Sequence, residues 1–366
     1  MPISIFSFFA GCGFLDLGFE KADYNIAFVN EIYEPFMKSY MFSRENLNIL
    51  PPKYGYDNSD INSYLGSEKL NGIINKERQN NIVGFIGGPP CPDFSCAGKN
   101  KGSVGKHGVL TRTYFELIIQ ERPDFFLFEN VKGLWKTKKH KAFYDEMREF
   151  MQINGYFTIE KLINSLEYGV PQERERVIML GFKYKNKNEK KLISEVLQNF
   201  TWGIDVNNQV DLIRNIEWPV QDEYIEDCQR DMPEDILREL TVQYWFDKNI
   251  VEAHYNRDDY FKPKQGLQKM KTIYEGDITR KSFKRLHRWR YSPTAAYGNN
   301  EVHLHPYKSR RLSISEVLAI QSLPSEFILP KDISLTDRFK TVGNGVPFLV
   351  SCKLAESLKA VLEEIF

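Results

Sequence analysis

The chain carries a cysteine in a turn that could expose it for chemistry. The stretch "GGPPCPDFS", Gly87 to Ser95, follows the apolar run "NIVGFI" and sets Cys91 behind two glycines and two prolines. A lone cysteine is usually a buried small residue, but a turn at the end of a strand supplies amide donors that favour the thiolate. Residues 93–108 are rich in glycine and lysine, a composition typical of a mobile lid. Cys91 is therefore a candidate nucleophile, with simple burial as the alternative.

Charged side chains follow two other apolar runs. Glu129 ends "FFLFENV", and an acid at the end of a buried strand has a raised pKa and can donate a proton. The alternative is a surface glutamate that caps the following helix. The run "PQERERVIML" places Arg174 and Arg176 on one side of a strand through two-residue alternation, unless they line a solvated strand edge.

A glycine-rich turn near the start of the chain is typical of nucleotide binding. In "FFAGCGFLDLGFE", Gly11 and Gly13 let backbone amides approach a ligand where a strand gives way to a helix. A tight turn without a ligand is the alternative. Glu31 follows about 20 residues later, where nucleotide-binding sheets place an acid for the ribose hydroxyls. Asp60 and Ile61 offer another acid beside an apolar surface, so the pattern indicates an adenosine-containing cofactor.

Five apolar runs alternate with polar, helix-compatible stretches, which predicts βαβ units around a mostly parallel, Rossmann-like sheet with helices on both faces. Each run ends on one of the features above, as expected at the carboxyl ends of parallel strands. We expect a catalytic domain at 1–183 and 338–366, where an amphipathic helix returns to the sheet. Residues 184–337 form a smaller, irregular domain. The five runs are "ISIFSFF", "NIAFVNEI", "NIVGFIGG", "DFFLFENV" and "RERVIMLGF".

Composition favours a soluble, cytoplasmic protein. The 366 residues are 42% hydrophobic and 27% charged, with no apolar run long enough for a membrane span. The five cysteines and six histidines show no metal-ligand spacing, so no metal is expected, and His303 and His305 are expected at the surface. The formal net charge is zero, but residues 257–311 hold 14 Lys/Arg against 5 Asp/Glu. Within this segment, Arg288 and Arg290 lie among aromatic residues and are candidates for phosphate or base contacts, although such residues also coat ordinary loops.

The order and spacing of eight motifs resemble those of the cytosine-C5 DNA methyltransferases, which use S-adenosylmethionine. The match runs from residue 5 to about 350 and leaves only residues 184–284 without a counterpart motif. It departs from the common pattern at Ser7, Phe14, Pro92 and Thr341. The motifs are "FFAGCGFLDLGFE", "NEI", "DI", "GGPPCPDFS", "FENV", "VPQERERVIMLG", "RRLSISEVLAIQSLP" and "VGNGVP".

The resemblance implies a role for each chemical group. Cys91 would add to carbon 6 of a flipped-out cytosine. Glu129 would stabilise the ring at N3, and Arg176 with Arg174 would hold the O2 edge and the neighbouring phosphate. Ser95 and Thr294 would contact DNA near the flipped nucleotide. The implied cofactor site comprises Phe9, Gly11, Gly13, Glu31, Ile32, Asp60, Ile61, Pro90 and Asn344.

The resemblance also implies partners. Duplex DNA is the expected substrate, with the protein a monomer that associates with the nucleoid when bound. A cognate restriction endonuclease acting on the same site is compatible with the pattern. A methyltransferase acting on cytosine in tRNA and a catalytically silent DNA-binding module of the same fold are the alternatives. A nucleotide-dependent oxidoreductase would leave Cys91 and the two arginines without a role.

Overall fold

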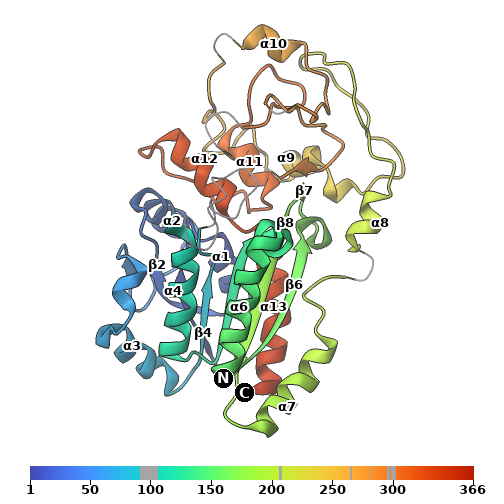
Figure 1. Ribbon diagram of the computed structural model, residues 1–366. Coiled ribbons are helices and arrows are strands. Elements are labelled where there is room, and N and C mark those ends of the chain that lie inside the picture. Colours follow the sequence, from blue (N-terminus) through green and yellow to red (C-terminus); the bar gives the residue numbers. More distant parts are fainter. Residues whose placement is uncertain (91–105, 206–207, 264–265, 281, 295–296, 298–301) are drawn as a thin grey trace.

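A central sheet organises the larger part of the molecule (Figure 1). The computed structural model describes the chain except residues 91–105, 206–207, 264–265, 281, 295–296 and 298–301. The strands are β1 (Ile3–Phe8), β2 (Asn25–Asn30), β3 (Tyr56–Asp57), β4 (Ile82–Gly87), β5 (Phe125–Val131), β6 (Tyr156–Asn164), β7 (Gln172–Glu173), β8 (Glu175–Lys183) and β9 (Ser292–Pro293). Seven of them form one sheet in the order β3-β2-β1-β4-β5-β8-β6.

The α-helices connect and cover these strands. They are α1 (Phe14–Lys21), α2 (Glu34–Asn46), α3 (Glu68–Arg78), α4 (Lys106–Glu121), α5 (Lys132–Lys136), α6 (Lys138–Ile153), α7 (Lys187–Val196), α8 (Val210–Arg214), α9 (Val242–Lys248), α10 (Leu267–Lys271), α11 (Ile314–Ile320), α12 (Leu335–Asn344) and α13 (Phe348–Ile365).

Both faces of the sheet are buried, because alternate residues of each central strand point to opposite sides. In β4, Ile82 and Ile86 join the core beneath α1, α2, α7 and α13, whereas Val83 and Phe85 join the core beneath α3, α4 and α6. Figure 1 shows α4 and α6 in front of the strands and α13 behind them. The predicted helix-covered sheet is confirmed.

Strand order brings the chemical motifs to one edge. Strands β1 to β5 pair in parallel, and the chain turns to β2 and β3 on one side of β1 and to β4 and β5 on the other. Phe8 is paired with Gly87, and Gly87 with Phe128, so the residues that follow these strands lie at the same level. Ligands bind at such a switch point. The sequence missed β6, and both β5 and β6 pair with β8 in antiparallel fashion.

The tail docks as expected. Helix α13 packs along α1, and a Cβ atom at Gly18 would lie 2.3 Å from Cβ of Ser351, so only glycine permits this approach. The region after β8 departs from the expected division at residue 184, because Ile193, Leu197 and Trp202 belong to the core of the sheet.

The rest of the chain forms the upper part of Figure 1, where the elements are short and joined by long loops. Its largest apolar cluster packs α9 and α11 against Cys12, Phe14 and Leu17, which attaches it to the beginning of α1. None of the helices within the described ranges is long and apolar enough to cross a membrane.

Candidate active site

The turn after β4 lies directly against the end of β5. A Cβ atom at Gly88 would be 2.7 Å from Oε2 of Glu129, so a glycine is needed to admit that carboxyl group. Asn130 Nδ2 donates to the carbonyl of Pro89 at 3.3 Å. The two strand ends are thereby tied together one residue before Pro90, which is exposed. Cys91 and Ser95 lie outside the described residues, but the turn that leads to Cys91 contacts Glu129.

Glu129 is paired with one of the two predicted arginines. Nε of Arg176 lies 3.0 Å from Oε1 of Glu129, across the antiparallel pairing of β5 with β8. Both side chains are largely withdrawn from water, with 15% and 11% of their surface exposed. Burial raises the pKa of Glu129, and the nearby Arg176 and Arg174 guanidinium groups oppose this rise. The raised pKa favours a carboxyl group that holds a proton, as the sequence predicts.

Arg174 is close by but points elsewhere. It stands between β7 and β8, and its Nη2 donates to the carbonyls of Gly343 (3.0 Å) and Asn344 (3.4 Å) at the end of α12. Its residue surface is 1% exposed, and burial, reinforced by Arg176, lowers the pKa of its guanidinium. Arg174 therefore connects the end of α12 to the beginning of β8. Two-residue alternation placed it near Arg176 correctly, but it is not part of the same strand.

The smaller region joins the sheet beside these arginines. Strand β9 pairs in parallel with β7, and Thr294 Oγ1 donates to the carbonyl of Glu173. Thr294 itself is exposed. The predicted threonine thus lies next to Arg174 through β7, although more than a hundred residues separate the two positions in sequence.

The glycine turn meets the predicted acid. Phe9, Gly11 and Gly13 all have positive φ angles, and Gly13 is the residue that precedes α1. Gly11 N donates to Oε2 of Glu31 at 2.9 Å, and Tyr33 N donates to Oε1 at 2.8 Å. Burial raises the pKa of Glu31, opposed by these two amides. Each carboxylate oxygen accepts one amide here and retains a further lone pair for a ligand hydroxyl.

The adjoining apolar residues differ in exposure. Ile32 is 56% exposed, whereas Ile61 is 2% exposed and lies in the core beneath α3 and α4. Asp60 caps the short 3₁₀ helix Ile61–Tyr64, accepting from Asn62 N at 2.9 Å. A carboxylate with free lone pairs beside an exposed aliphatic side chain fits the ribose and base of an adenosine group. Ile32 is better placed than Ile61 to cover the base.

Comparison with known proteins identifies the family of the chain. The family model of C-5 cytosine-specific DNA methylase matches residues 3–360. The chain belongs to this family.

The methylase also resembles individual proteins of known class. It is 52% identical to the type II methyltransferase M.NmeDI of Neisseria meningitidis serogroup C, an alignment that covers 98% of this chain and 84% of the relative. It is 27% identical to the type II methyltransferase M.MthTI of Methanothermobacter thermautotrophicus, over 100% and 99% of the two chains. The predicted family and the predicted enzyme class, DNA (cytosine-5) methyltransferase, are therefore confirmed.

Solved structures share the fold of the methylase. A DNA modification methyltransferase encoded in an Escherichia coli prophage superposes with a TM-score of 0.66 at 19% identity, covering 99% of this chain and 100% of that one. The Dnmt2 methyltransferase of S. pombe gives a TM-score of 0.60 at 13% identity, with 99% of both chains covered. At these identities the likeness concerns the fold alone.

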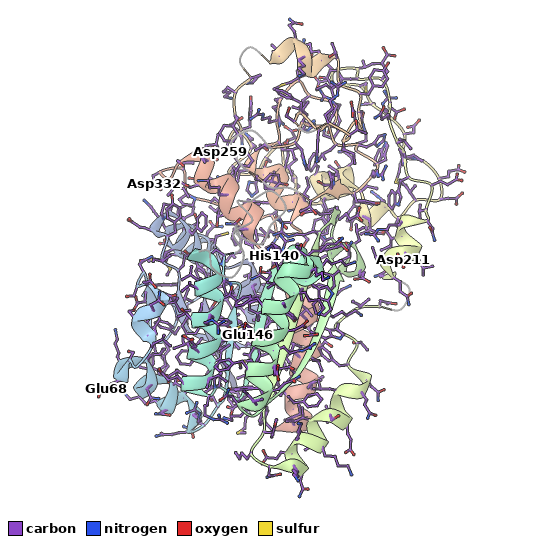
Figure 2. All side chains as sticks on the ribbon, in the orientation of Figure 1. Glu68, His140, Glu146, Asp211, Asp259 and Asp332 are labelled. Carbon is purple, nitrogen blue, oxygen red and sulfur yellow. The ribbon has the colours of Figure 1, made fainter. Side chains whose placement is uncertain are left out.

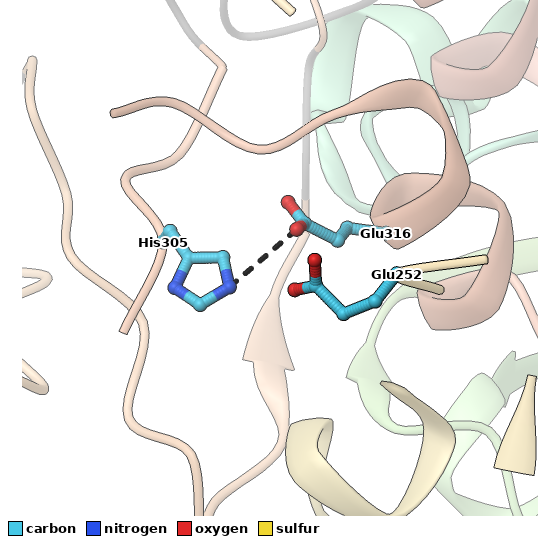
Figure 3. A group of neighbouring side chains, drawn as sticks. All are labelled: Glu252, His305 and Glu316. Carbon is cyan, nitrogen blue, oxygen red and sulfur yellow. Dashed lines mark ion pairs between the residues drawn. The ribbon is translucent and has the colours of Figure 1, made fainter. Parts of the chain in front are cut away.

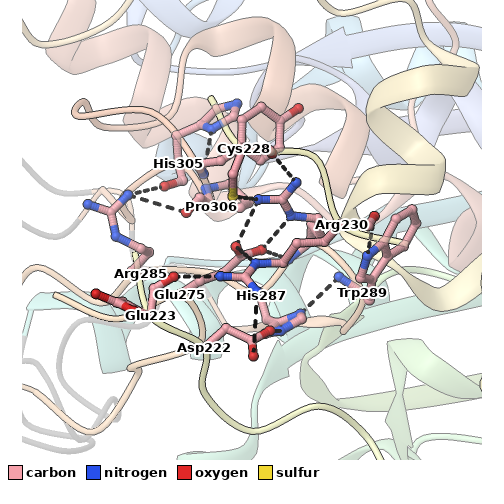
Figure 4. Close-up of polar contacts among 12 residues, drawn as sticks. Asp222, Glu223, Cys228, Arg230, Glu275, Arg285, His287, Trp289, His305 and Pro306 are labelled. Atoms are coloured by element: carbon pink, nitrogen blue, oxygen red, sulfur yellow. Dashed lines mark hydrogen bonds and ion pairs between the residues drawn. The ribbon is translucent and has the colours of Figure 1, made fainter. Parts of the chain in front are cut away.

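Arg288 of the methylase is buried in the smaller region, where it binds Glu275 and the carbonyl of Cys228, two residues that Figure 4 labels. Its residue surface is 4% exposed, and Nε and Nη2 donate to the two oxygens of Glu275 at 2.8 and 2.9 Å. This buried ion pair does not support the DNA contact expected for Arg288. Arg290 is half-buried and donates to the carbonyl of Pro219 at 3.4 Å. Both arginines fix neighbouring segments of the smaller region.

The expectation of surface histidines at 303 and 305 is wrong. His303 is 3% exposed and His305 is fully buried, and burial lowers the pKa of both. Their side chains pack among aromatic rings, His303 against Tyr297 and His305 against Tyr307. The two polar histidines in "HLH" led us to expect a surface segment, but His303, Leu304 and His305 are all buried.

Within the described residues, His305 belongs to a group that brings possible metal ligands together (Figure 3). The other members are Glu252 and Glu316, and the three ligand atoms lie within 4.8 Å of one another. Arg310 binds both oxygens of Glu316 at 2.6 and 2.9 Å, and Lys308 lies 2.5 Å from Glu252. Since cations already neutralise both carboxylates, this donor set does not fit a metal ion.

Sequence reasoning missed a buried polar network beneath the glycine turn. Arg44 Nη2 donates to the carbonyl of Gly13 at 2.7 Å, and its Nε lies 2.8 Å from Glu20 Oε2. Asp16 accepts from Ser7 Oγ at 2.9 Å and from the Tyr40 hydroxyl at 3.0 Å. Helix α2 thus holds the turn from behind. The sequence did offer one indication of this network, because Tyr40 and Arg44 are four residues apart and therefore lie on the same face of a helix.

Proposed function

We propose that this methyltransferase modifies cytosine in one specific sequence of duplex DNA and that it protects that sequence from a partner restriction endonuclease. The observation that carries the proposal is the contact between Glu129 and the turn leading to Cys91. The named class of M.NmeDI, a type II methyltransferase aligned over 98% of this chain, supports the modification role. A monomeric, cytoplasmic protein remains our expectation.

In the proposed reaction, the Cys91 thiolate adds to carbon 6 of a flipped-out cytosine. Glu129 gives a proton or hydrogen bond to N3, which stabilises the charge that spreads over the ring. Arg176 holds Glu129 in place and presents its remaining donors to the O2 edge. Carbon 5 would take the methyl group that S-adenosylmethionine supplies when bound. A base, for which water is a candidate, then accepts the proton from carbon 5, the bond between carbon 6 and Cys91 breaks, and the thiolate is restored.

We propose that the cofactor is held at the adjoining strand ends. Glu31 would bind the ribose hydroxyls, Ile32 with Pro90 would cover the adenine, and the turn from Phe9 to Gly13 with Asn344 would face the methionine portion. S-adenosylmethionine supplies the methyl group. Two observations support this assignment. Ile32 and Pro90 are exposed, and the backbone amides of Gly11 and Tyr33 hold the carboxylate of Glu31 in place.

We propose that residues 205–337 recognise the target sequence. The beginning differs from the expected 184 because α7 and Trp202 pack with the sheet. Thr294, exposed at the junction of β9 with β7, would lie near the flipped nucleotide. Ser95 would contact DNA from the segment that follows Cys91.

Bisulfite sequencing of DNA from cells that express the protein tests activity, base and recognition site together. We expect one methylated cytosine in one recurring sequence, and no methylation with Cys91→Ala. A purified protein that labels tRNA but no duplex DNA would contradict the DNA assignment.

A mechanistic test uses duplex DNA with 5-fluorocytosine at the target. Fluorine replaces the proton on carbon 5 and cannot be removed by a base, so the thiol is not eliminated. With S-adenosylmethionine present, a covalent complex should therefore persist with the wild type. A complex that forms equally well with Cys91→Ala would exclude Cys91 as the nucleophile.

A further inference from the structure

The segment immediately after the catalytic strand is strongly basic. Residues 131–141, "VKGLWKTKKHK", contain five lysines and one histidine but no acid. They form the end of β5, helix α5 and the first turn of α6. The segment begins two residues after Glu129, so its position is determined by the same strand that places the catalytic carboxyl group.

This segment lies on the rim of the candidate active site. Leu134 is fully buried and attaches α5 to the core, and Lys132 pairs with Glu175, the neighbour of Arg176. Figure 2 places His140 at the end of α6 that faces the smaller region, and Glu146 farther along the same helix. Helix α5 spans only about 7.5 Å at 1.5 Å per residue, so its far end remains close to the catalytic strand ends.

Two of the lysines are exposed and free of ion pairs. Lys132 and Lys141 are neutralised locally, by Glu175 and Asp145 respectively. Lys136 and Lys138 are exposed, and neither forms an ion pair with any residue that the structure describes. The rim therefore carries uncompensated positive charge.

The fold does not benefit from that charge. Lys138 is the first residue of α6, where the helix dipole is already positive, and Thr137 gives no side-chain cap. A cation at this position is unfavourable to the helix, whereas an acid would stabilise it. Helix α3 follows the favourable pattern, with Glu68 in its first turn and Lys76 and Arg78 in its last. Charges that work against local stability are expected at functional surfaces.

We infer that Lys136 and Lys138 form a binding surface for the backbone phosphates of duplex DNA that flank the target cytosine. The inference rests on the proposed function and extends it to a surface of the catalytic domain. A duplex carries about one charge per 1.7 Å of its axis, so a target base held near Glu129 brings phosphates past this rim. Such contacts position the duplex and carry no sequence information.

The experiment compares Lys136→Gln/Lys138→Gln with a matched control, Lys187→Gln/Lys190→Gln. The control lysines are exposed on α7, at the end of the molecule opposite the smaller region in Figure 1, and Lys187 also lies in a first helical turn. Binding to a short duplex is measured by fluorescence anisotropy between about 50 and 200 mM salt. The slope of log K against log salt reports the number of phosphate contacts, at about 0.9 each.

We expect the slope of the rim variant to fall by about 1.8 in magnitude, so that its affinity changes about 10-fold less than that of the wild type over this range. The control variant and Lys136→Arg/Lys138→Arg should retain the wild-type slope, and melting temperatures should be similar throughout. A rim variant with the wild-type slope would overturn the inference. If the rim variant shows the reduced slope but the wild type methylates no cytosine, only the proposed function is overturned. If the affinity of the wild type for DNA does not depend on salt, both the inference and the proposed function are overturned.

Discussion

Nε of Arg176 lies 3.0 Å from Oε1 of Glu129, on adjacent antiparallel strands that end beside the turn leading to Cys91. The pair is largely buried, and the arginine orients the carboxyl group without preventing the rise of its pKa. This single contact joins two motifs that lie more than forty residues apart in sequence. The contact also allows the effects of substitutions at Glu129 and at its neighbour Gly88 to be predicted.

Glu129→Gln should retain DNA binding and lose most turnover. The amide can still occupy the site, but it cannot give up a proton to N3, and removing one such stabilising group typically costs about 10²–10³ in kcat. Because the pKa of Glu129 is raised, its protonated form persists to higher pH than that of an ordinary glutamate. Wild-type kcat should fall as the pH rises through this raised pKa. A steady-state pH profile checks the prediction. The Arg112→Gln control, which changes an exposed pair with Glu146 and keeps Glu129, should show the wild-type fall. A residual kcat of Glu129→Gln that falls in the same way would contradict the role of Glu129.

Gly88→Ala should impair catalysis by displacing the carboxyl group of Glu129. The added Cβ would lie 2.7 Å from Oε2, closer than real contacts allow. A displacement of about 1 Å at a reacting group can cost about 100-fold in kcat. Gly72→Ala on α3 is the control, since its Cβ meets nothing within 4 Å and should slightly raise the melting temperature. Equal kcat values for the two variants would contradict the close contact.

Arg44→Lys should weaken cofactor binding while leaving DNA binding unchanged. Lysine keeps the charge beside Glu20 and Asp16 but cannot reproduce the guanidinium geometry that reaches Gly13. The glycine turn would lose its support from α2, so we expect KM for S-adenosylmethionine to rise about 10-fold with a smaller change in kcat. Isothermal titration with S-adenosylhomocysteine provides an independent measurement. A variant that lowers only the melting temperature would show that Arg44 stabilises the fold without positioning the turn.

The lowered pKa of Glu77 should make the free energy of unfolding depend on pH. Burial acts to raise its pKa, but hydrogen bonds from Lys53, Ser4, Tyr54 and Asn81 outweigh it and lower the pKa to about 2. A carboxylate whose pKa is lowered by folding stabilises the protein above its unfolded pKa of about 4.3, and this contribution is lost as the pH falls towards 2.

The Glu77→Gln variant tests this pH dependence. It should unfold more easily than the wild type at neutral pH, by about 1–3 kcal/mol for a disrupted buried network. The difference in free energy of unfolding, measured with urea from pH 7 to 3, should shrink below about pH 5. A difference that is constant with pH would indicate packing alone.

The sequence by itself determined five of the seven strands of the sheet and which residues follow them at the edge that carries the candidate active site. Five apolar runs became β1, β2, β4, β5 and β8, because period-two burial on both faces of a parallel sheet leaves few other solutions. The short spacing from each run to its motif then fixed which residues follow each strand. Cys91, Glu129 and Glu31 are local features of this kind, which is why their motifs sufficed to find the family.

Only the tertiary structure decided where the long charged side chains point. Arg174 reaches Gly343, 169 residues away, and Arg288 is buried against Glu275, because a guanidinium withdrawn from water must find acceptors wherever packing supplies them. Local pattern could not distinguish these arginines from Lys136 and Lys138, which remain in solvent. Whether a charge meets DNA or completes the interior depends on partners distant in sequence, and those are set only when the chain has folded.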